Sequence, residues 1–178
     1  DQVQDDGGTT VFRCLQDAPH WRLDWEVLFA DACPVHGVWL IDQCSRCGKA
    51  LSWKRDRLLL CDCGQPLVQQ RAVSCPPNVG RLSQVLVDKL VDQKTPRSFG
   101  PTEALDVRQL QRLIRFFGSY ADPDPGPRPQ KISGLDKLAV SWRLTSLAAE
   151  LLGRWPEALH EVLERMQARH VVEGGGRL

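Results

Sequence analysis

The sequence has no long hydrophobic run and no excess of charge of one sign. Its apolar stretches fall far short of the ~18–20 residues that a membrane-spanning helix requires, and its first ten residues form no apolar signal segment. The 178 residues carry 23 lysines and arginines against 22 aspartates and glutamates. We therefore expect a cytoplasmic protein in which any contact with nucleic acid comes from a local patch rather than from overall charge.

Common catalytic motifs are also lacking. The sequence holds no G-x-x-x-x-G-K-[ST] phosphate loop, no G-x-S-x-G nucleophile turn and no carboxylate cluster of the kind that holds Mg²⁺ in strand-transfer nucleases. We assign no catalytic residue, and we expect a binding protein rather than an enzyme.

Cysteine, by contrast, is plentiful and lies wholly within the first 75 residues. Seven cysteines at short intervals are typical of metal ligands rather than of a secreted disulfide framework. The clearest unit is two close pairs, Cys44 with Cys47 and Cys61 with Cys63. Zn²⁺ prefers four soft ligands at ~2.3 Å, and two thiolate pairs joined by a hairpin supply them. This spacing predicts a zinc ribbon with a structural zinc ion.

The segment between the two pairs is predicted to form a β-hairpin. Residues 51–53 and 58–60 resemble short strands that flank a charged turn. Gly48 and Gly64 follow the second cysteine of each pair, where a tight turn needs the positive φ that glycine adopts at low cost. Two alternatives stay open: a reduced cysteine cluster without metal, and a metal bound instead by Cys33, His36, Cys44 and Cys47.

A second unit combines Cys14 with Cys33-Pro-Val-His36. A matching four-ligand site would need a cysteine three residues before Cys14, where Val11 stands, so the site is one ligand short. Three ligands and an open position are typical of catalytic zinc, whose bound water has a pKa lowered to ~7.

Simpler interpretations of this second unit are a structural site completed by His20, Asp17 or a water molecule, or an empty site. We favour them because no glutamate or histidine is spaced to act as a general base beside Cys33 and His36.

The order of these motifs resembles the TniQ/TnsD family of transposition proteins. Members carry CPxC, an aromatic-W-R-x-x-W segment, CPxHG, CPxCG and CxCG. The matching segments here are Cys14, His20-Trp21-Arg22-Leu23-Asp24-Trp25, Cys33-Pro34-Val35-His36-Gly37, Cys44-Ser45-Arg46-Cys47-Gly48 and Cys61-Asp62-Cys63-Gly64. The resemblance covers residues 11 to 66 and, more loosely, the remainder around Trp155-Pro156. Val11 replaces the family's first cysteine, and Ser45 replaces the usual proline.

The resemblance implies a target-selection factor: a non-catalytic adaptor that links target DNA, or a target-recognising complex, to an AAA+ ATPase regulator and so to the transposase. It implies a bacterial protein, and it leaves a homodimer open. The family commonly begins with a helix-turn-helix segment that this sequence lacks, and the start at Asp1 without methionine suggests a fragment. The alternatives are a zinc-ribbon DNA-binding transcription regulator and, less favoured, a zinc-dependent hydrolase or deaminase that uses the open first site.

Beyond the cysteines the chain has helical periodicity. Apolar stripes predict helices from Val79 to about Lys94, from a capping box at Asp106 and Gln109 to Gly118, from Leu138 to about Gly153, and from Pro156 through Met166. The predicted fold is mainly α: a tandem zinc-finger region at 11–68 with small zinc-ribbon β-hairpin elements, then an approximately four-helix bundle at 76–170 with a proline-rich loop at 121–131.

Local positive charge gathers at the tip of the predicted hairpin, at Lys49, Lys54, Arg55 and Arg57. A protruding turn with several cations can approach a phosphate backbone and release counterions, so these residues are the candidate nucleic-acid contacts. A solvated turn is an equally good interpretation, as is a solvated helix face for Arg112 and Arg115. Cys75 is expected to be a free, partly buried thiol.

Overall fold

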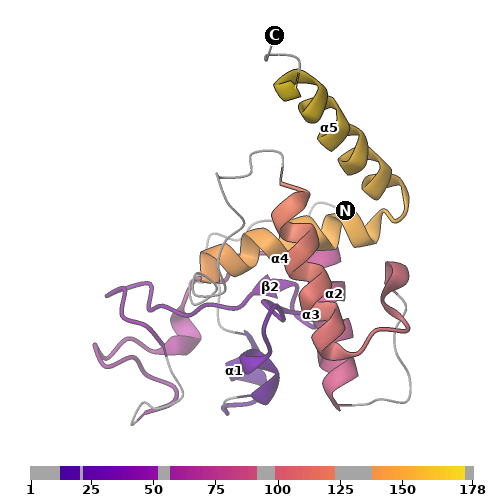
Figure 1. Ribbon diagram of the computed structural model, residues 1–178. Coiled ribbons are helices and arrows are strands. Elements are labelled where there is room, and N and C mark those ends of the chain that lie inside the picture. The colour runs from indigo at the N-terminus through magenta and orange to yellow at the C-terminus, as the bar shows by residue number, and fades with distance from the viewer. Residues whose placement is uncertain (1–12, 21, 52–56, 92–98, 123–137, 175–178) are drawn as a thin grey trace, which may run out of the picture.

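The chain is mainly helical, with a small two-stranded antiparallel sheet (Figure 1). The computed structural model describes residues 13–20, 22–51, 57–91, 99–122 and 138–174. Its α-helices are α1 (Arg13–Asp17), α2 (Pro77–Val91), α3 (Val107–Tyr120), α4 (Leu138–Gly153) and α5 (Glu157–Gly174). Short 3₁₀ turns lie at Leu23–Glu26, Leu67–Gln69 and Gly100–Thr102, and the strands are β1 (Ala32–Cys33) and β2 (Val38–Trp39). The structure thus confirms that the fold is mainly α with a small amount of β-structure.

Helices α2 to α5 coincide broadly with the four predicted amphipathic segments, and a local signal sets the start of α3. The Asp106 carboxylate accepts a hydrogen bond from the Gln109 backbone N–H at 2.7 Å, and the Gln109 side chain accepts one from the Asp106 backbone N–H at 2.9 Å. This is the predicted capping box of α3. Helix α2 ends at Val91, and Lys94 lies outside the described residues. Helices α2, α3 and α4 pack against one another around the main hydrophobic core.

Gly118 does not end α3, so that prediction was wrong. The helix continues to Tyr120, and Gly118 is buried against α4. A Cβ atom at Gly118 would lie 2.6 Å from the carbonyl oxygen of Leu144. The position needs glycine because the two helix backbones approach each other closely, not because the chain must turn there.

Part of the cysteine-rich region shares the main core with the helices. Phe29, Ala32 and Trp39 are buried there. The Trp39 ring stacks on Trp142 of α4, with ring centroids 4.7 Å apart. The backbone N–H of Ala32 donates to Ser83 Oγ of α2 at 3.2 Å. The sheet is therefore fixed to the inner faces of α2 and α4.

Asp31, just before β1, is a buried carboxylate with only 5% of its surface exposed. Ser141 Oγ and Thr145 Oγ1, both of α4, donate to its Oδ2 at 2.7 Å and 2.6 Å. Burial raises the pKa of Asp31, and the two hydroxyl donors oppose this effect without cancelling it. The carboxylate thus anchors the start of β1 to α4.

A second, smaller hydrophobic cluster lies around the later cysteines. It consists of Leu15, Cys44, Cys61 and Leu67, all buried. Leu15 comes from α1, which packs against the 3₁₀ turn Leu67–Gln69. We call this group the small core.

The described residues place the β-structure differently from the prediction. The two-stranded sheet contains Cys33 and flanks the turn that carries His36, whereas residues 58–60 form no strand and contribute only an isolated bridge between Leu60 and Pro66. Residues 52–56, and most of the predicted proline-rich loop, lie outside the described part of the chain. The prediction of a zinc-ribbon strand at residues 58–60 was therefore wrong. Short turns shape this segment instead.

Helix α5 joins the main core through Ala158, Val162 and the partly buried Met166. Figure 1 shows it projecting away from the end of α4. Leu163, predicted to lie on its apolar stripe, is 45% exposed. Among the described helices, none combines the length and the apolar character needed to cross a bilayer.

Candidate metal centres

The two later cysteine pairs converge on one point, as predicted. The Sγ atoms of Cys44, Cys47, Cys61 and Cys63 all lie within 4.8 Å of one another. Cys44 Sγ is 3.8 Å from Cys63 Sγ, and Cys47 Sγ is 3.6 Å from Cys61 Sγ. A tetrahedron with metal–sulfur bonds of ~2.3 Å has edges of about 3.8 Å, which the two Sγ–Sγ distances of 3.8 Å and 3.6 Å match. We call this group the four-cysteine centre.

Two similar turns build the four-cysteine centre. The backbone N–H of Gly48 donates to the carbonyl of Cys44 at 2.8 Å, and that of Gly64 donates to the carbonyl of Cys61 at 2.8 Å. The φ angles of Gly48 and Gly64 are 70° and 84°. Residues with side chains rarely adopt such angles, which confirms the predicted reason for glycine after each pair.

Hydrogen bonds favour the thiolate form of Cys44. Burial disfavours ionisation, but the backbone N–H groups of Cys47 and Arg46 and the Gln70 amide outweigh it and lower the pKa of Cys44 to about 6. The Lys49 backbone N–H lowers the pKa of Cys47, but burial and the neighbouring thiols together raise it to about 12. The Cys44 sulfur therefore favours the thiolate form that binds metal, whereas a metal ion must displace the proton of Cys47.

Gln70 is a site residue that sequence reasoning missed. It is fully buried, its Nε2 donates to Cys44 Sγ at 3.5 Å, and its Oε1 accepts a hydrogen bond from the Ser45 backbone N–H at 2.8 Å. Such outer contacts orient a metal ligand. Gln70 comes after Cys63, the last cysteine of the centre, and no sequence motif marks a glutamine at this spacing as a contact of a metal ligand.

Cys14, Cys33 and His36 form the second cluster, here called the cysteine–histidine centre. The two Sγ atoms are 3.1 Å apart, and the Nδ1 atom of His36 is 3.0 Å from Cys14 Sγ and 3.3 Å from Cys33 Sγ. Both cysteines are buried. Around a zinc ion these edges are about 3.6–3.8 Å, so the three atoms fit the ion after separating by about half an ångström.

The elements that hold this centre are α1 and the turn between the two strands. Cys14 lies on α1, Cys33 ends β1, and His36 follows in the turn. The Gly37 backbone N–H donates to the Cys33 carbonyl at 2.9 Å, and Gly37 has a φ of 63°. The turn repeats the geometry seen after Cys47 and Cys63.

The two thiols of the cysteine–histidine centre lie within hydrogen-bond distance, with their Sγ atoms 3.1 Å apart. The Cys14 thiol donates to Cys33, which lowers the pKa of Cys33 to about 5. The same hydrogen bond, together with burial, raises the pKa of Cys14 well above its usual range. The arrangement favours an anionic site that receives a cation.

Two of the suggested fourth ligands do not join the three. His20 is exposed and lies outside the cluster. Asp17 Oδ2 contacts the other ring nitrogen of His36, Nε2, at 2.9 Å. Val11 lies outside the described residues.

Only part of the predicted basic tip falls within the described residues. Lys49 and Arg57 are exposed, and Lys49 Nζ lies 4.0 Å from the Asp62 carboxylate. Lys54 and Arg55 lie outside the described range.

A different basic surface runs along α3. Arg108, Arg112, Phe116 and Tyr120 recur every four residues and are all exposed. Phe116 is 55% and Tyr120 45% exposed, and their ring centroids are 4.6 Å apart. A solvated helix face is the expected role of Arg112 from the sequence alone. The signal available was the four-residue spacing that aligns two arginines with two aromatic residues. We call this surface the α3 ridge.

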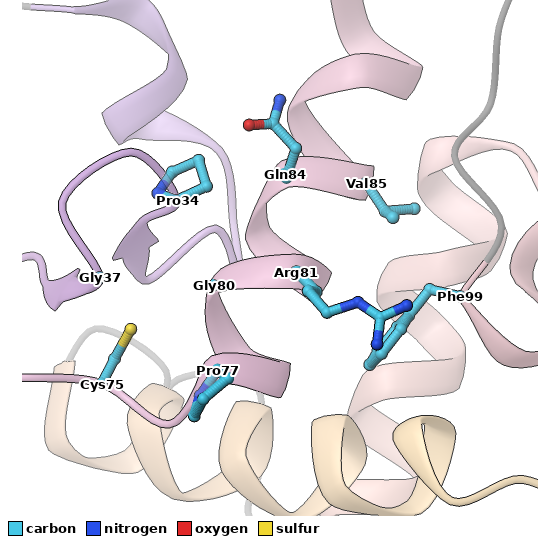
Figure 2. Close-up of a pocket in the computed structure, with 9 residues that line it drawn as sticks. All are labelled: Pro34, Gly37, Cys75, Pro77, Gly80, Arg81, Gln84, Val85 and Phe99. Carbon is cyan, nitrogen blue, oxygen red and sulfur yellow. The ribbon is translucent and has the colours of Figure 1, made fainter. Parts of the chain in front are cut away.

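A cavity of about 410 Å³ lies between the turn of the cysteine–histidine centre and α2 (Figure 2). Pro34 and Cys75 line one side, and Arg81, stacked over the Phe99 ring at 4.9 Å, lines another. Burial raises the pKa of the Cys75 thiol, which favours the inert thiol form. Cys75 belongs to neither metal cluster, as predicted for a free thiol.

The two cysteine clusters and the α3 ridge are the features of the described residues that bear on function. Compared with known protein families, with curated proteins and with solved structures, the chain matches none of them.

Proposed function

We propose that this chain is a non-catalytic adaptor in DNA transposition, a target-selection factor that links target DNA or a target-recognising complex to an AAA+ ATPase regulator. The order of the cysteine and aromatic motifs supports the role in transposition. The two cysteine clusters and the mainly helical fold support a platform that presents surfaces to partners. Zinc is the proposed metal at both centres.

The observation that supports a structural role for a bound metal is the four-cysteine centre. Its four sulfurs are close enough to fill all positions of a tetrahedral ion. A closed site of this kind leaves no position for a substrate or a reactive water, so its ion stabilises the fold.

Contact with nucleic acid is proposed at the α3 ridge. Arginine guanidinium groups pair with phosphates, and exposed aromatic rings stack on unpaired bases. Arg108 and Arg112 supply the cations, and Phe116 and Tyr120 supply the rings. This surface favours a single-stranded or partly unpaired target over an intact duplex.

The test is binding of fluorescent single-stranded and duplex DNA over a series of salt concentrations. Replacing Arg108 and Arg112 by Glu should weaken binding and reduce the salt slope by about 1 for each phosphate that the variant no longer neutralises. Phe116→Ala and Tyr120→Ala should each weaken single-strand binding by ~1–3 kcal/mol. Arg165→Glu makes the charge change of one such replacement at an exposed position of α5, and is the control for each single Arg108→Glu and Arg112→Glu variant.

Binding curves of the α3 variants that overlay those of the parent would remove the ridge from the proposal. Reversing the charges of Lys54, Arg55 and Arg57 tests the basic tip in the same assay. The role in transposition is tested separately, by asking whether the protein co-purifies with an AAA+ ATPase regulator of transposition. Failure to associate, with or without DNA, would overturn that role.

A further inference from the structure

The cysteine–histidine centre has an internal asymmetry that the four-cysteine centre lacks. The two nitrogens of the His36 ring face different partners: Nδ1 faces the two sulfurs, and Nε2 faces Asp17. The His36 side chain is 14% exposed, and the Asp17 side chain is 66% exposed. The carboxylate therefore reaches the ring from the solvent side, while the metal-facing nitrogen points inward.

The contact with Asp17 favours the tautomer of His36 that carries its proton on Nε2. A neutral imidazole has one N–H donor and one acceptor nitrogen. With Nε2 donating to Asp17, the lone pair of Nδ1 is left free to face Cys14 and Cys33. Carboxylates in this position fix the tautomer of a metal-binding histidine and increase its basicity.

The same contact also shows that Asp17 is not the missing fourth ligand. Its oxygen lies on the far side of the imidazole from the metal-facing nitrogen. Among the described residues no other cysteine, histidine or carboxylate joins the three ligand atoms. Two thiolates and one imidazole are a donor set that leaves one tetrahedral position free in known zinc sites.

We propose that Asp17 positions His36 at the cysteine–histidine centre, and that the metal bound there keeps its fourth position for an exchangeable ligand from outside the chain. Water fills the position in the isolated protein, and a nitrogen or sulfur donor can displace it. The inference does not depend on the role in transposition, and it requires no catalytic step.

The exchangeable position is tested by ¹¹³Cd NMR of the cadmium-loaded full chain with added imidazole. An all-sulfur site and a site with two sulfurs and a nitrogen give separate signals. Imidazole should move the signal of the cysteine–histidine centre and leave the signal of the four-cysteine centre in place. Cys75→Ser should change neither signal, because Cys75 belongs to neither cluster.

Three results would overturn the exchangeable position. If both signals ignore imidazole, the fourth ligand comes from the chain itself and the centre is closed. If Cys75→Ser moves the signal of the cysteine–histidine centre, Cys75 is that ligand. If the chain takes up a single cadmium ion, the cysteine–histidine centre does not hold metal.

Asp17 is tested by zinc affinity and by the ¹⁵N shifts of His36. Asp17→Ala should weaken zinc binding at the cysteine–histidine centre about 10–100-fold, whereas Asp17→Asn, which keeps an acceptor oxygen, should recover part of that loss. Asp62→Asn is the matched control, because Asp62 is equally exposed beside the four-cysteine centre but pairs with Lys49. Equal affinities in all three variants, or metal on Nε2 rather than Nδ1, would reject the positioning role.

Discussion

Individual residues in this chain are constrained by what lies close to their backbone. Gly48 and Gly64 have open space around the position of a Cβ atom, and their constraint is a positive φ. Gly118 has the opposite constraint, since a Cβ atom there would overlap Leu144. The same residue type thus serves turn formation at the metal centres and close helix contact in the main core.

Gly118→Ala should destabilise the fold by about 1–3 kcal/mol, because α3 and α4 must separate to admit the methyl group. The measurement is urea unfolding of the metal-saturated chain. Gly153→Ala is the control: a Cβ atom there meets the side-chain end of Asn78, which can move away. A Gly118→Ala variant no less stable than the Gly153→Ala variant would contradict the close contact of the two helices.

Cys61→Ser should remove the metal ion of the four-cysteine centre and lower the melting temperature. Cys61 is 5% exposed and supplies one of four ligands, and structural zinc contributes an apparent ~10–16 kcal/mol of binding energy in small zinc-finger peptides. Metal analysis and thermal melting check this outcome. Cys75→Ser should retain the full metal content, since Cys75 lies outside both clusters. An unchanged melting curve for Cys61→Ser would show that the four sulfurs do not support the fold.

At the scale of elements, the sheet and α4 are joined by a polar contact and an aromatic contact. The polar contact is the buried Asp31 carboxylate with the hydroxyls of Ser141 and Thr145. The aromatic contact is the stack of Trp39 on Trp142. Both partners of Asp31 are neutral, so burial makes its ionised form costly in this position.

The free energy of unfolding of the parent protein should therefore decrease relative to that of the Asp31→Asn variant as pH rises. The folded state raises the pKa of Asp31 above its usual value of 3.8, so the folded chain retains a proton that the unfolded chain has already released. The contribution of Asp31 is most favourable below about pH 4 and is lost as pH rises through the folded pKa. Parallel urea unfolding of both proteins from about pH 4 upward measures the difference. The exposed Asp62→Asn serves as the control, and a difference that grows in favour of the parent with rising pH would contradict the assignment.

Local patterns predicted the elements well and their contacts poorly. The capping box at Asp106 and the turn glycines at Gly48 and Gly64 depend on neighbours a few residues away, so the sequence reveals them. The four ligands of the four-cysteine centre follow from spacing for the same reason.

Other features depend on distant partners and were not predicted. The burial of Asp31 depends on hydroxyls 110 and 114 residues further along the chain. The orientation of Gln70 toward Cys44 and the contact of Gly118 with α4 likewise arise only when remote segments pack together. The two strands lie on either side of the turn that carries His36, and their residues Ala32 and Trp39 contact α2 and α4, which spacing alone does not indicate.

At the scale of the whole molecule, the two candidate metal centres lie beside different hydrophobic clusters. The turn of the cysteine–histidine centre is continuous with the main core, whereas the four-cysteine centre belongs to the small core. The division into domains at 11–68 and 76–170 stays a prediction, with Trp39 and Trp142 in contact across it.

Two consecutive residues of helix α1 connect the cysteine–histidine centre with the small core. Cys14 is a ligand of the cysteine–histidine centre, and the next residue, Leu15, is 2% exposed in the small core. A metal ion that binds Cys14 also fixes the position of Leu15 in the small core. Metal binding at the cysteine–histidine centre therefore lowers the entropy cost of ordering the four-cysteine centre. Calorimetric titration should consequently show cooperative zinc uptake, and Leu15→Ala, which leaves every cysteine in place, should make the two equivalents bind independently.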